Sequence, residues 1–451
     1  SVLGKRIDYV RISPDHEYIL KKLLGFGVVK KSASGDFPWL YHFISGYLIS
    51  DSGIFCTLTL TAQTAYALAK YGSDELKEKF LKMYIKGENN WLGATYYSET
   101  QGGSDLGANN TVAVPQDGKW ILNGKDKYFA SDAGLADGAL VTAKIREGYG
   151  VRNLSLFFVP ALHENGEPNY EIRRLKDKLG TVAVPTGEVE FHDSSGYLIG
   201  EEKNGVYYAM EVLTVSRIDD ALAAVGIARK SLWEAFFFAN KRESFGKKII
   251  EHPILLRDFL ELESELEAST FLSLFTAKMF SDASKSLPPY SSEYNFARLL
   301  SHVAKNMASD TSTAVTRYSM EIFGGIGFFE EFPAAKFHRD ALVTSIWEGT
   351  SNIQALDMME VILKKKAHVK MLEVFSNLIS KIPDAEVREK LVKIKTLVEN
   401  EISGLSGGHE EEAYFKEILK LIGKFTSTVL MYSHFKFSRK SRGKEFIDGN
   451  G

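Results

Sequence analysis

TSIWEGTSNIQ, residues 344–354, places one carboxylate, Glu348, between the large indole of Trp347 and the small Gly349. Two hydroxyl residues follow directly. Two interpretations compete for Glu348: an ordinary solvated loop acid, and a partly desolvated acid that takes up a proton in a reaction. Other parts of the chain are needed to decide between them.

Composition sets the first limits. The chain has 451 residues, enough for several domains at roughly 100–200 residues each. With 44% apolar and 25% charged residues it is typical of a globular protein. A net charge of −3 gives no bulk attraction to nucleic acid or to an anionic membrane. Cys56 is the only cysteine, which excludes an internal disulfide and a cysteine metal cluster and fits a cytoplasmic protein.

The N-terminus and the longest uncharged run bear on targeting. Residues 1–18 lack the apolar core of a signal peptide. The missing initiator methionine is compatible with a trimmed chain or one that begins inside the gene product. Residues 52–69 are uncharged over about the length of a membrane span, but four threonines, a serine and a glutamine interrupt them. We therefore predict a buried helix there and no membrane insertion.

Within the first 200 residues, the spacing of apolar residues changes near residue 94. Before it, apolar residues recur at three- and four-residue spacing, and Ser73 and Gly87 can begin and end one helix. After it come short alternating runs, among them TVAVPQDGKWILNGK at 111–125, whose Gln-Asp-Gly turn indicates a hairpin. Helices followed by a small barrel or sandwich are the expected result.

Helical spacing then returns and continues almost to the C-terminus. Pro288 and Pro289 interrupt it once, and SGLSGGHEEE at 403–412 separates two amphipathic segments. The tail HFKFSRKSRGKEF, residues 434–446, is basic, and both a solvated terminus and a contact with nucleic acid or a partner stay open. The predicted fold class is mainly α with a central β-domain. Its domains are residues 1–93, 94–203, 204–364 (a helix bundle) and 365–451 (an extra helical domain).

Several common sources of chemistry are missing from the sequence. No strand pattern is followed by Gly-x-Gly-x-x-Gly, which argues against a nicotinamide Rossmann domain. There is no Gly-x4-Gly-Lys-Ser/Thr phosphate loop and no His-Glu-x-x-His helix. The ten histidines show no metal-ligand spacing, so no metal is expected.

Two segments in the β-rich part suit a polar planar ligand. YYSETQGGSD, residues 96–105, combines serines with paired glycines that expose backbone N–H groups. KYFASDAG, residues 127–134, places an aromatic ring beside a serine. An ordinary Gly-Ser loop and a core aromatic remain the alternatives.

Two segments in the later helical part add possible phosphate contacts. KRESFGKKIIEHP, residues 241–253, places Arg242 before a Ser-Phe-Gly turn, and an arginine fork suits phosphates. A solvated charge at a helix end is equally compatible. EIFGGIGFF, residues 321–329, has two adjacent glycines that allow close backbone approach, 23 residues before Glu348.

Taken together and in this order, ETQGGSD, RESFGK, FGGIGF and WEGTSNIQ resemble the acyl-CoA dehydrogenase family of flavoproteins over roughly residues 10–363. RLKDKLGTVAVPTGEVEFHDSSGYLIG, SRIDDALAAVG and TSIWEGTSNI are most similar to the branch that contains the alkylation-response protein AidB. The resemblance implies a helical N-terminal domain, a central β-domain and a C-terminal bundle. It also implies non-covalent FAD, a homodimer or homotetramer, and an electron-transfer flavoprotein as acceptor.

The resemblance also implies roles for individual residues. Ser98 lies near the flavin pyrimidine, Phe129 fills the position of a stacking tryptophan, and Ser131 that of the hydroxyl at flavin N5. Arg242 and its neighbours match the segment that reaches the FAD of another subunit. The substrate contacts implied are Ser104, Arg217 and Gly349. The implied FAD contacts are Tyr97, Ser98, Ser104, Phe129, Ser131, Arg242, Ser244, Phe245, Glu321, Gly324, Gly325, Trp347, Thr350 and Asn352.

The sequence departs from the family pattern in four places. Phe129 replaces the usual tryptophan, Glu321 a common glutamine, and Pro253 a glutamine whose hydrogen bond it cannot donate. One residue is inserted between Gly124 and Lys127. These departures concern the fit of FAD more than its presence.

The implied reaction is α,β-dehydrogenation of an acyl-CoA thioester, with the β-hydride passing to flavin N5. The family carries its base either on the loop of Glu348 or immediately before Arg217, where this chain has Ser216. Because serine cannot act as that base, the assignment falls on Glu348, and desolvation by Trp347 is expected to raise its pKa. For Arg217, a structural charge pair with Asp219 or Asp220 stays open.

Two other functions compete with this enzyme. An AidB-like flavoprotein would bind DNA in an alkylation response and keep weak dehydrogenase activity. The acidic net charge disfavours that nucleic-acid contact, whereas the basic tail favours it. A flavin-dependent oxidase or monooxygenase on the same fold is the third interpretation, although its usual variants lose the loop acid.

Overall fold

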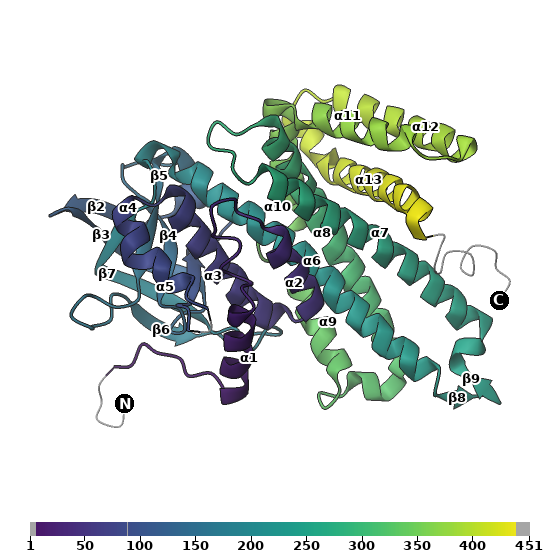
Figure 1. Cartoon of the computed structure of the whole chain (residues 1–451), viewed down its shortest axis with the longest axis horizontal. Coiled ribbons are helices and arrows are strands. Elements are labelled where there is room, and N and C mark those ends of the chain that lie inside the picture. Colours follow the sequence, from purple (N-terminus) through teal and green to yellow (C-terminus); the bar gives the residue numbers. More distant parts are fainter. Residues whose placement is uncertain (1–5, 88, 439–451) are drawn as a thin grey trace. The chain divides into compact units, whose positions relative to one another are not determined.

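The computed structural model describes residues 6–87 and 89–438, and its contacts divide the chain into two compact units, Ser1–Asp219 and Asp220–Gly451 (Figure 1). The boundary falls within the long helix α6 (Gly205–Ala239). Among the described residues, no helix combines the length and apolar character needed to cross a bilayer. The chain is mainly α with a central β-domain, as predicted.

The first unit begins with helices. They are α1 (Pro14–Gly25), α2 (Leu40–Ile49), α3 (Ser52–Tyr71), α4 (Asp74–Leu76), a π-helical turn η1 (Lys77–Leu81) and α5 (Lys82–Tyr84). The Ser73 hydroxyl accepts a hydrogen bond from the Leu76 N–H at 3.2 Å, which confirms the predicted N-cap. Most residues of α3 are buried, which confirms the predicted buried helix.

A seven-stranded sheet follows the helices (Figure 1). Its strands are β1 (Gly93–Tyr96), β2 (Val112–Gln116), β3 (Lys119–Ser131), β4 (Gly138–Lys144), β5 (Leu154–Pro160), β6 (Glu171–Leu175) and β7 (Thr186–Leu198). Pairing runs from β4 through β2, β3, β7 and β5 and returns to β4, so these strands close into a small barrel. Of the predicted barrel or sandwich, the barrel is therefore the one found.

Two local features of the barrel match details of the sequence. Asp117 and Gly118 join β2 to β3 with φ of 49° and 78°, the conformation of a tight hairpin turn. A register shift on β3 lies between Gly124 and Lys127, which pair with Phe191 and Val189 of β7. Three steps on β3 thus oppose two on β7, which is a bulge at the place where an inserted residue is expected.

The second unit is a helix bundle extended by C-terminal helices. After the C-terminal part of α6 come β8 (Glu243–Ser244), β9 (Lys247–Lys248), α7 (Pro253–Ala283), α8 (Ser292–Phe323), η6 (Gly324–Phe328), α9 (Pro333–Val343) and α10 (Ser351–Lys365). Pro288 and Pro289 lie between α7 and α8, as predicted. Helix α8 packs against α7, α9 and α10, so it is the centre of this bundle.

The C-terminal helices are α11 (Ala367–Ser380), α12 (Ala385–Ser403), a short η7 (His409–Tyr414) and α13 (Phe415–Ser438). The glycine-rich stretch at 403–412 separates α12 from α13, as predicted, but the break at Pro383 between α11 and α12 was missed. Helix α13 packs on α7, α8 and α10 (Figure 1). Most of the basic tail at 434–446 lies outside the described residues.

Candidate functional site

In the first unit, the serine-glycine loop runs beside the end of β3. The Tyr128 N–H donates to the Ser98 carbonyl at 3.1 Å, which places Ser98 next to the strand that carries Phe129. Ser98 is half-buried, whereas Phe129 is 55% exposed. An exposed ring beside a polar loop is a surface on which a planar ligand can stack.

A buried ion pair anchors this loop. The Lys127 Nζ lies 3.0 Å from the Glu99 Oε1, and both side chains are fully buried. Glu99 also accepts from the Thr111 N–H and hydroxyl at 3.1 and 2.7 Å and from the Asn110 N–H at 2.5 Å. Burial alone would raise the pKa of Glu99, but the Lys127 charge and these hydrogen bonds outweigh it and lower the pKa. Lys127 donates further to the Thr142 carbonyl at 2.9 Å.

One of the paired glycines, Gly103, is required by packing. An added Cβ on Gly103 would lie 2.2 Å from the Ser98 Oγ, so a larger residue would push that hydroxyl aside. Tyr97 is buried behind the loop, whereas Ser104 is exposed on it. Of the residues expected on the loop, Ser98 and Phe129 are thus brought together, and Ser104 lies on the open side.

A buried acid that was not predicted from the sequence follows strand β3 directly. Ser131 is half-buried at the strand end, and Asp132 follows it fully buried, with φ of 59°. The Asp132 carboxylate accepts from the Thr57 hydroxyl at 3.0 Å. Burial raises its pKa to about 7, against the hydrogen bond from Thr57, which lowers it. Thr57 and Asp132 together show that polar groups gather between α3 and the barrel.

The first-unit part of α6 holds the other predicted positions. Ser216 and Arg217 are both buried, and Ser216 accepts a hydrogen bond from the Gln63 side chain. Asp219 lies 3.1 Å from His42 Nε2, while His42 Nδ1 lies 3.0 Å from the Val28 carbonyl. Burial raises the pKa of Asp219, and the neighbouring imidazole lowers it.

In the second unit, the acid loop is tightly held. Trp347, Glu348 and Gly349 are half-buried, and Glu348 and Gly349 have φ of 56° and 98°. The Gln354 Nε2 donates to the carbonyls of both Glu348 and Gly349, each at 2.9 Å. Thr350 is the exposed N-cap residue of α10. A non-glycine residue in left-handed backbone is uncommon and is often found at functional sites.

The residues expected to contact FAD phosphates lie at two exposed turns. Phe245 and Gly246 join β8 to β9 with φ of 54° and 77°, and Phe245 is 94% exposed. Arg242 is exposed before this turn, and Ser244 within β8 is half-buried. The turn therefore exposes a large apolar side chain that a binding partner could cover.

The second turn follows α8. Gly324 and Gly325 are exposed, and a Cβ added to either would meet no atom of the described chain within 4 Å. Glu321, one helical turn earlier, pairs with Arg317. Asn352, at the start of α10, accepts from the Lys416 Nζ of α13 at 3.3 Å. The bare backbone at the glycines leaves space for a phosphate-bearing group.

The comparisons with known proteins decide which family this is. The model "Acyl-CoA dehydrogenase, middle domain" matches residues 94–194, and "Acyl-CoA dehydrogenase, C-terminal domain" matches residues 203–363. The short-chain specific acyl-CoA dehydrogenase of Megasphaera elsdenii is 31% identical over 311 residues, 68% of this chain and 76% of that protein. The chain belongs to the acyl-CoA dehydrogenase family.

Two further relatives match a larger share of this chain. AidB of Escherichia coli is 28% identical over 382 residues, 80% of this chain and 68% of AidB. The crystal structure of Caenorhabditis elegans ACDH-11 in complex with C11-CoA aligns with a TM-score of 0.85 at 25% identity, covering 99% of this chain and 80% of that one. The alignment with ACDH-11 thus covers nearly the whole chain, including its C-terminal helices.

Membership of the acyl-CoA dehydrogenase family makes this chain an FAD-dependent oxidoreductase that acts on acyl-CoA. Each unit carries features that fit the cofactor. The first offers the exposed Phe129 ring beside Ser98 and Ser131, and the second offers the bare backbone at Gly324 and Gly325. Aromatic and hydroxyl groups suit a flavin ring, and open backbone suits a pyrophosphate.

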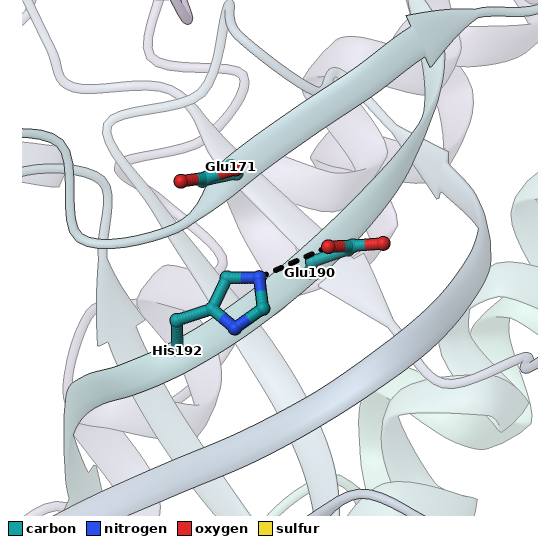
Figure 2. Close-up of side chains that lie close together, drawn as sticks. All are labelled: Glu171, Glu190 and His192. Carbon is teal, nitrogen blue, oxygen red and sulfur yellow. Dashed lines mark hydrogen bonds and ion pairs between the residues drawn. The ribbon is translucent and has the colours of Figure 1, made fainter.

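The described residues also contain one group of potential metal ligands, on β6 and β7: Glu171, Glu190 and His192 (Figure 2). The His192 Nε2 lies 2.9 Å from the Glu190 Oε2. Arg173 lies 3.0 Å from the other oxygen of Glu190, and Arg6 lies 3.1 Å from Glu171. Since arginines already neutralise both carboxylates, the group is explained as a surface ion-pair network.

Proposed function

We propose that this chain catalyses α,β-dehydrogenation of an acyl-CoA thioester and that Glu348 is the base that removes the α-proton. The observation that carries the proposal is the conformation of Glu348, a half-buried acid in left-handed backbone directly before Gly349. Such backbone costs on the order of 1–3 kcal/mol and persists only where the surroundings enforce it. A solvated loop acid has no need of that constraint.

The residues of the loop suit proton abstraction next to a thioester. The α-proton is weakly acidic, so the base must be close, aimed and poorly solvated. Glu348 is half-buried, which suits a base that must be poorly solvated. Gly349 lets the substrate approach the backbone, and we assign to the Glu348 N–H a hydrogen bond to the developing enolate oxygen.

Protons and electrons balance in the proposed reaction. The α-proton goes to the Glu348 carboxylate, and the β-hydrogen leaves with its electron pair as the α,β double bond forms. Bound FAD supplies the hydride acceptor at its N5 atom. Reoxidation needs an electron acceptor, and we assign an electron-transfer flavoprotein, the usual partner implied by the family. Serine at position 216 cannot take over the proton, so Glu348 carries this role.

A second candidate function rests on the similarity to AidB, which covers 80% of this chain. In that function the flavoprotein binds DNA in an alkylation response and dehydrogenates acyl-CoA only weakly. Its positive charge would come from the basic tail at 434–446, because the net charge of the whole chain is −3. We favour the enzyme, since DNA binding normally requires many phosphate contacts.

One experiment separates the two functions. The FAD-loaded protein is mixed anaerobically with butyryl-CoA, undecanoyl-CoA and longer acyl-CoAs while the flavin absorbance near 450 nm is followed. Rapid bleaching with at least one acyl-CoA supports the enzyme. Absence of bleaching with all of them, together with salt-sensitive retention of duplex DNA that disappears when residues 434–451 are removed, supports the DNA-binding function.

A further inference from the structure

A second carboxylate lies under the acid loop, on α6. Asp220 has a side chain only 2% exposed, and it accepts a hydrogen bond from the indole Nε1–H of Trp347. Trp347 directly precedes Glu348, so this bond fixes the ring next to the proposed base. Asp220 lies in the segment SRIDDALAAVG, 128 residues before Glu348, but nothing in the sequence places it at the acid loop.

A buried lysine connects Asp220 to the other side of Glu348. The Lys305 Nζ, on α8, lies 3.7 Å from the Asp220 Oδ2 and donates to the Gly349 carbonyl at 2.6 Å. Its side chain is 1% exposed. Asp220 therefore contacts groups that hold the residues on both sides of Glu348: the indole before it directly, and the carbonyl after it through Lys305.

The same carbonyl receives a second donor. The Gln354 Nε2 donates to Gly349 as well as to the Glu348 carbonyl, and the Gln354 Oε1 lies 2.8 Å from His302 Nδ1. This network accounts for the left-handed backbone at Glu348, because Gln354 and Lys305 donate hydrogen bonds to the carbonyls of the turn. The Glu348 side chain is thereby aimed by contacts that do not involve its own carboxylate.

Besides these contacts, Asp220 and Glu348 interact through their charges. Burial raises the pKa of Asp220 well above its usual range, while the Lys305 charge and the Trp347 hydrogen bond lower it and the Glu348 charge raises it. The charged groups facing Asp220 are thus Lys305 from α8 and Glu348 from the loop, and His302 reaches the loop through Gln354. Because electrostatic coupling is mutual, an ionised Asp220 must raise the proton affinity of Glu348 to the same extent.

We propose that Asp220 is a positioning residue for the reaction: it holds Trp347 and Lys305 around the acid loop, and when it ionises its charge makes Glu348 a stronger base. The inference rests on the proposed function of Glu348 and deepens it. The charges of Asp220 and Glu348 repel each other, so the second of the two carboxyl groups ionises against a like charge. An ordinary ion pair of the bundle would stabilise the fold and would leave the proton affinity of Glu348 unchanged.

The first test needs no activity. The full-length FAD protein is labelled with 5-fluorotryptophan, and the ¹⁹F resonance of Trp347 is assigned from Trp347→Phe and followed across pH. We expect this resonance to titrate, to move in Asp220→Asn, and to titrate with a different midpoint in Glu348→Gln. A Trp347 resonance with the same position and titration in wild type and both variants would overturn the proposal. If Asp220→Asn does not fold, the Glu348→Gln midpoint decides alone.

The second test measures the rate of flavin reduction by a reactive acyl-CoA across pH. Asp220→Asn keeps an oxygen acceptor for the indole and removes the charge, so its profile should move toward lower pH by roughly one unit. The matched control is Glu360→Gln, which makes the same change at a half-exposed acid on α10 and should leave the profile in place. If flavin reduction is slower in Asp220→Asn but the midpoint of its pH profile is unchanged, the role of Asp220 is merely structural and the proposal is wrong. If no acyl-CoA reduces the wild type, the proposed function fails, and the ¹⁹F titration still decides the coupling.

Discussion

The ammonium of Lys127 lies 3.0 Å from the Glu99 carboxylate, and neither side chain is exposed to solvent. This pair joins the serine-glycine loop to β3. Replacing Lys127 by methionine would leave Glu99 charged and buried, which typically costs about 3–5 kcal/mol. We expect Lys127→Met to lower the free energy of unfolding by that amount, measured by chemical denaturation, and to weaken FAD retention.

The double variant Glu99→Gln with Lys127→Met is the control for this prediction. It removes both charges, and the side-chain oxygen of the introduced glutamine can still accept from Thr111. It should recover much of the lost stability. A double variant as unstable as Lys127→Met alone would show that the charges are not responsible.

Asp132 predicts an unusual dependence of stability on pH. Its pKa is about 7 in the folded chain, above the ordinary value of 3.8 that applies when the chain is unfolded. The folded state therefore binds more protons, so stability is highest below about pH 4 for this group and falls as the pH rises toward 7. Asp132→Asn should raise the melting temperature relative to wild type at pH 8 and much less at pH 5.

A matched control for Asp132 exists in the hairpin turn. Asp117 also has a left-handed backbone, with φ of 49°, but it is exposed. Asp117→Asn should change the melting temperature equally at both pH values. A pH-independent gain in Asp132→Asn would mean that asparagine is favoured by the backbone and not by the removed charge.

Gly103 tests whether the loop positions the Ser98 hydroxyl for FAD. An added methyl group would lie 2.2 Å from that oxygen, so Gly103→Ala should weaken FAD binding by roughly tenfold, measured by fluorescence titration of the apoprotein. In a Ser98→Ala background the clash is relieved, and the same substitution should cost less. An equal cost in both backgrounds would contradict this explanation.

Phe245 tests the expected contribution of a neighbouring subunit. Its side chain is 94% exposed at the tip of a turn, where truncation would hardly affect an isolated chain. If a second copy covers it, burial is worth about 1.5–3 kcal/mol. Phe245→Ala should then raise the dissociation constant of the oligomer by about 10- to 100-fold in sedimentation experiments and weaken FAD retention. Unchanged assembly and FAD content would remove Phe245 from the interface.

Much of the fold could be predicted from local sequence signals. The Asp117–Gly118 turn, the Ser73 cap and the Pro288–Pro289 break each depend on residues adjacent in the chain, and all three are confirmed. The residue inserted before Lys127 stays a prediction, although one of the register shifts of β3 lies at that place. The break at Pro383 was missed because both flanking segments share one helical spacing.

The groups that hold the candidate site could not be predicted in this way. Asp220 and Lys305 meet the acid loop from helices far away in the sequence, and Asp132 is buried by α3. An aspartate within an apolar stripe has no local pattern that distinguishes a buried acid from a solvated one. The role of Glu348 stays a prediction: its neighbours Trp347 and Gly349 left two interpretations open, and the family resemblance assigned it as the base.

The most direct test of the account is the rate of anaerobic flavin reduction in Glu348→Gln. The variant keeps the size of the side chain and the loop contacts through Gln354, so its FAD content should equal that of the wild type. Loss of a positioned base typically costs about 10²–10⁴-fold. We predict that acyl-CoA reduces the wild-type flavin rapidly and the variant at least about a hundredfold more slowly. Near-wild-type reduction by Glu348→Gln would contradict the assignment of Glu348 as the base.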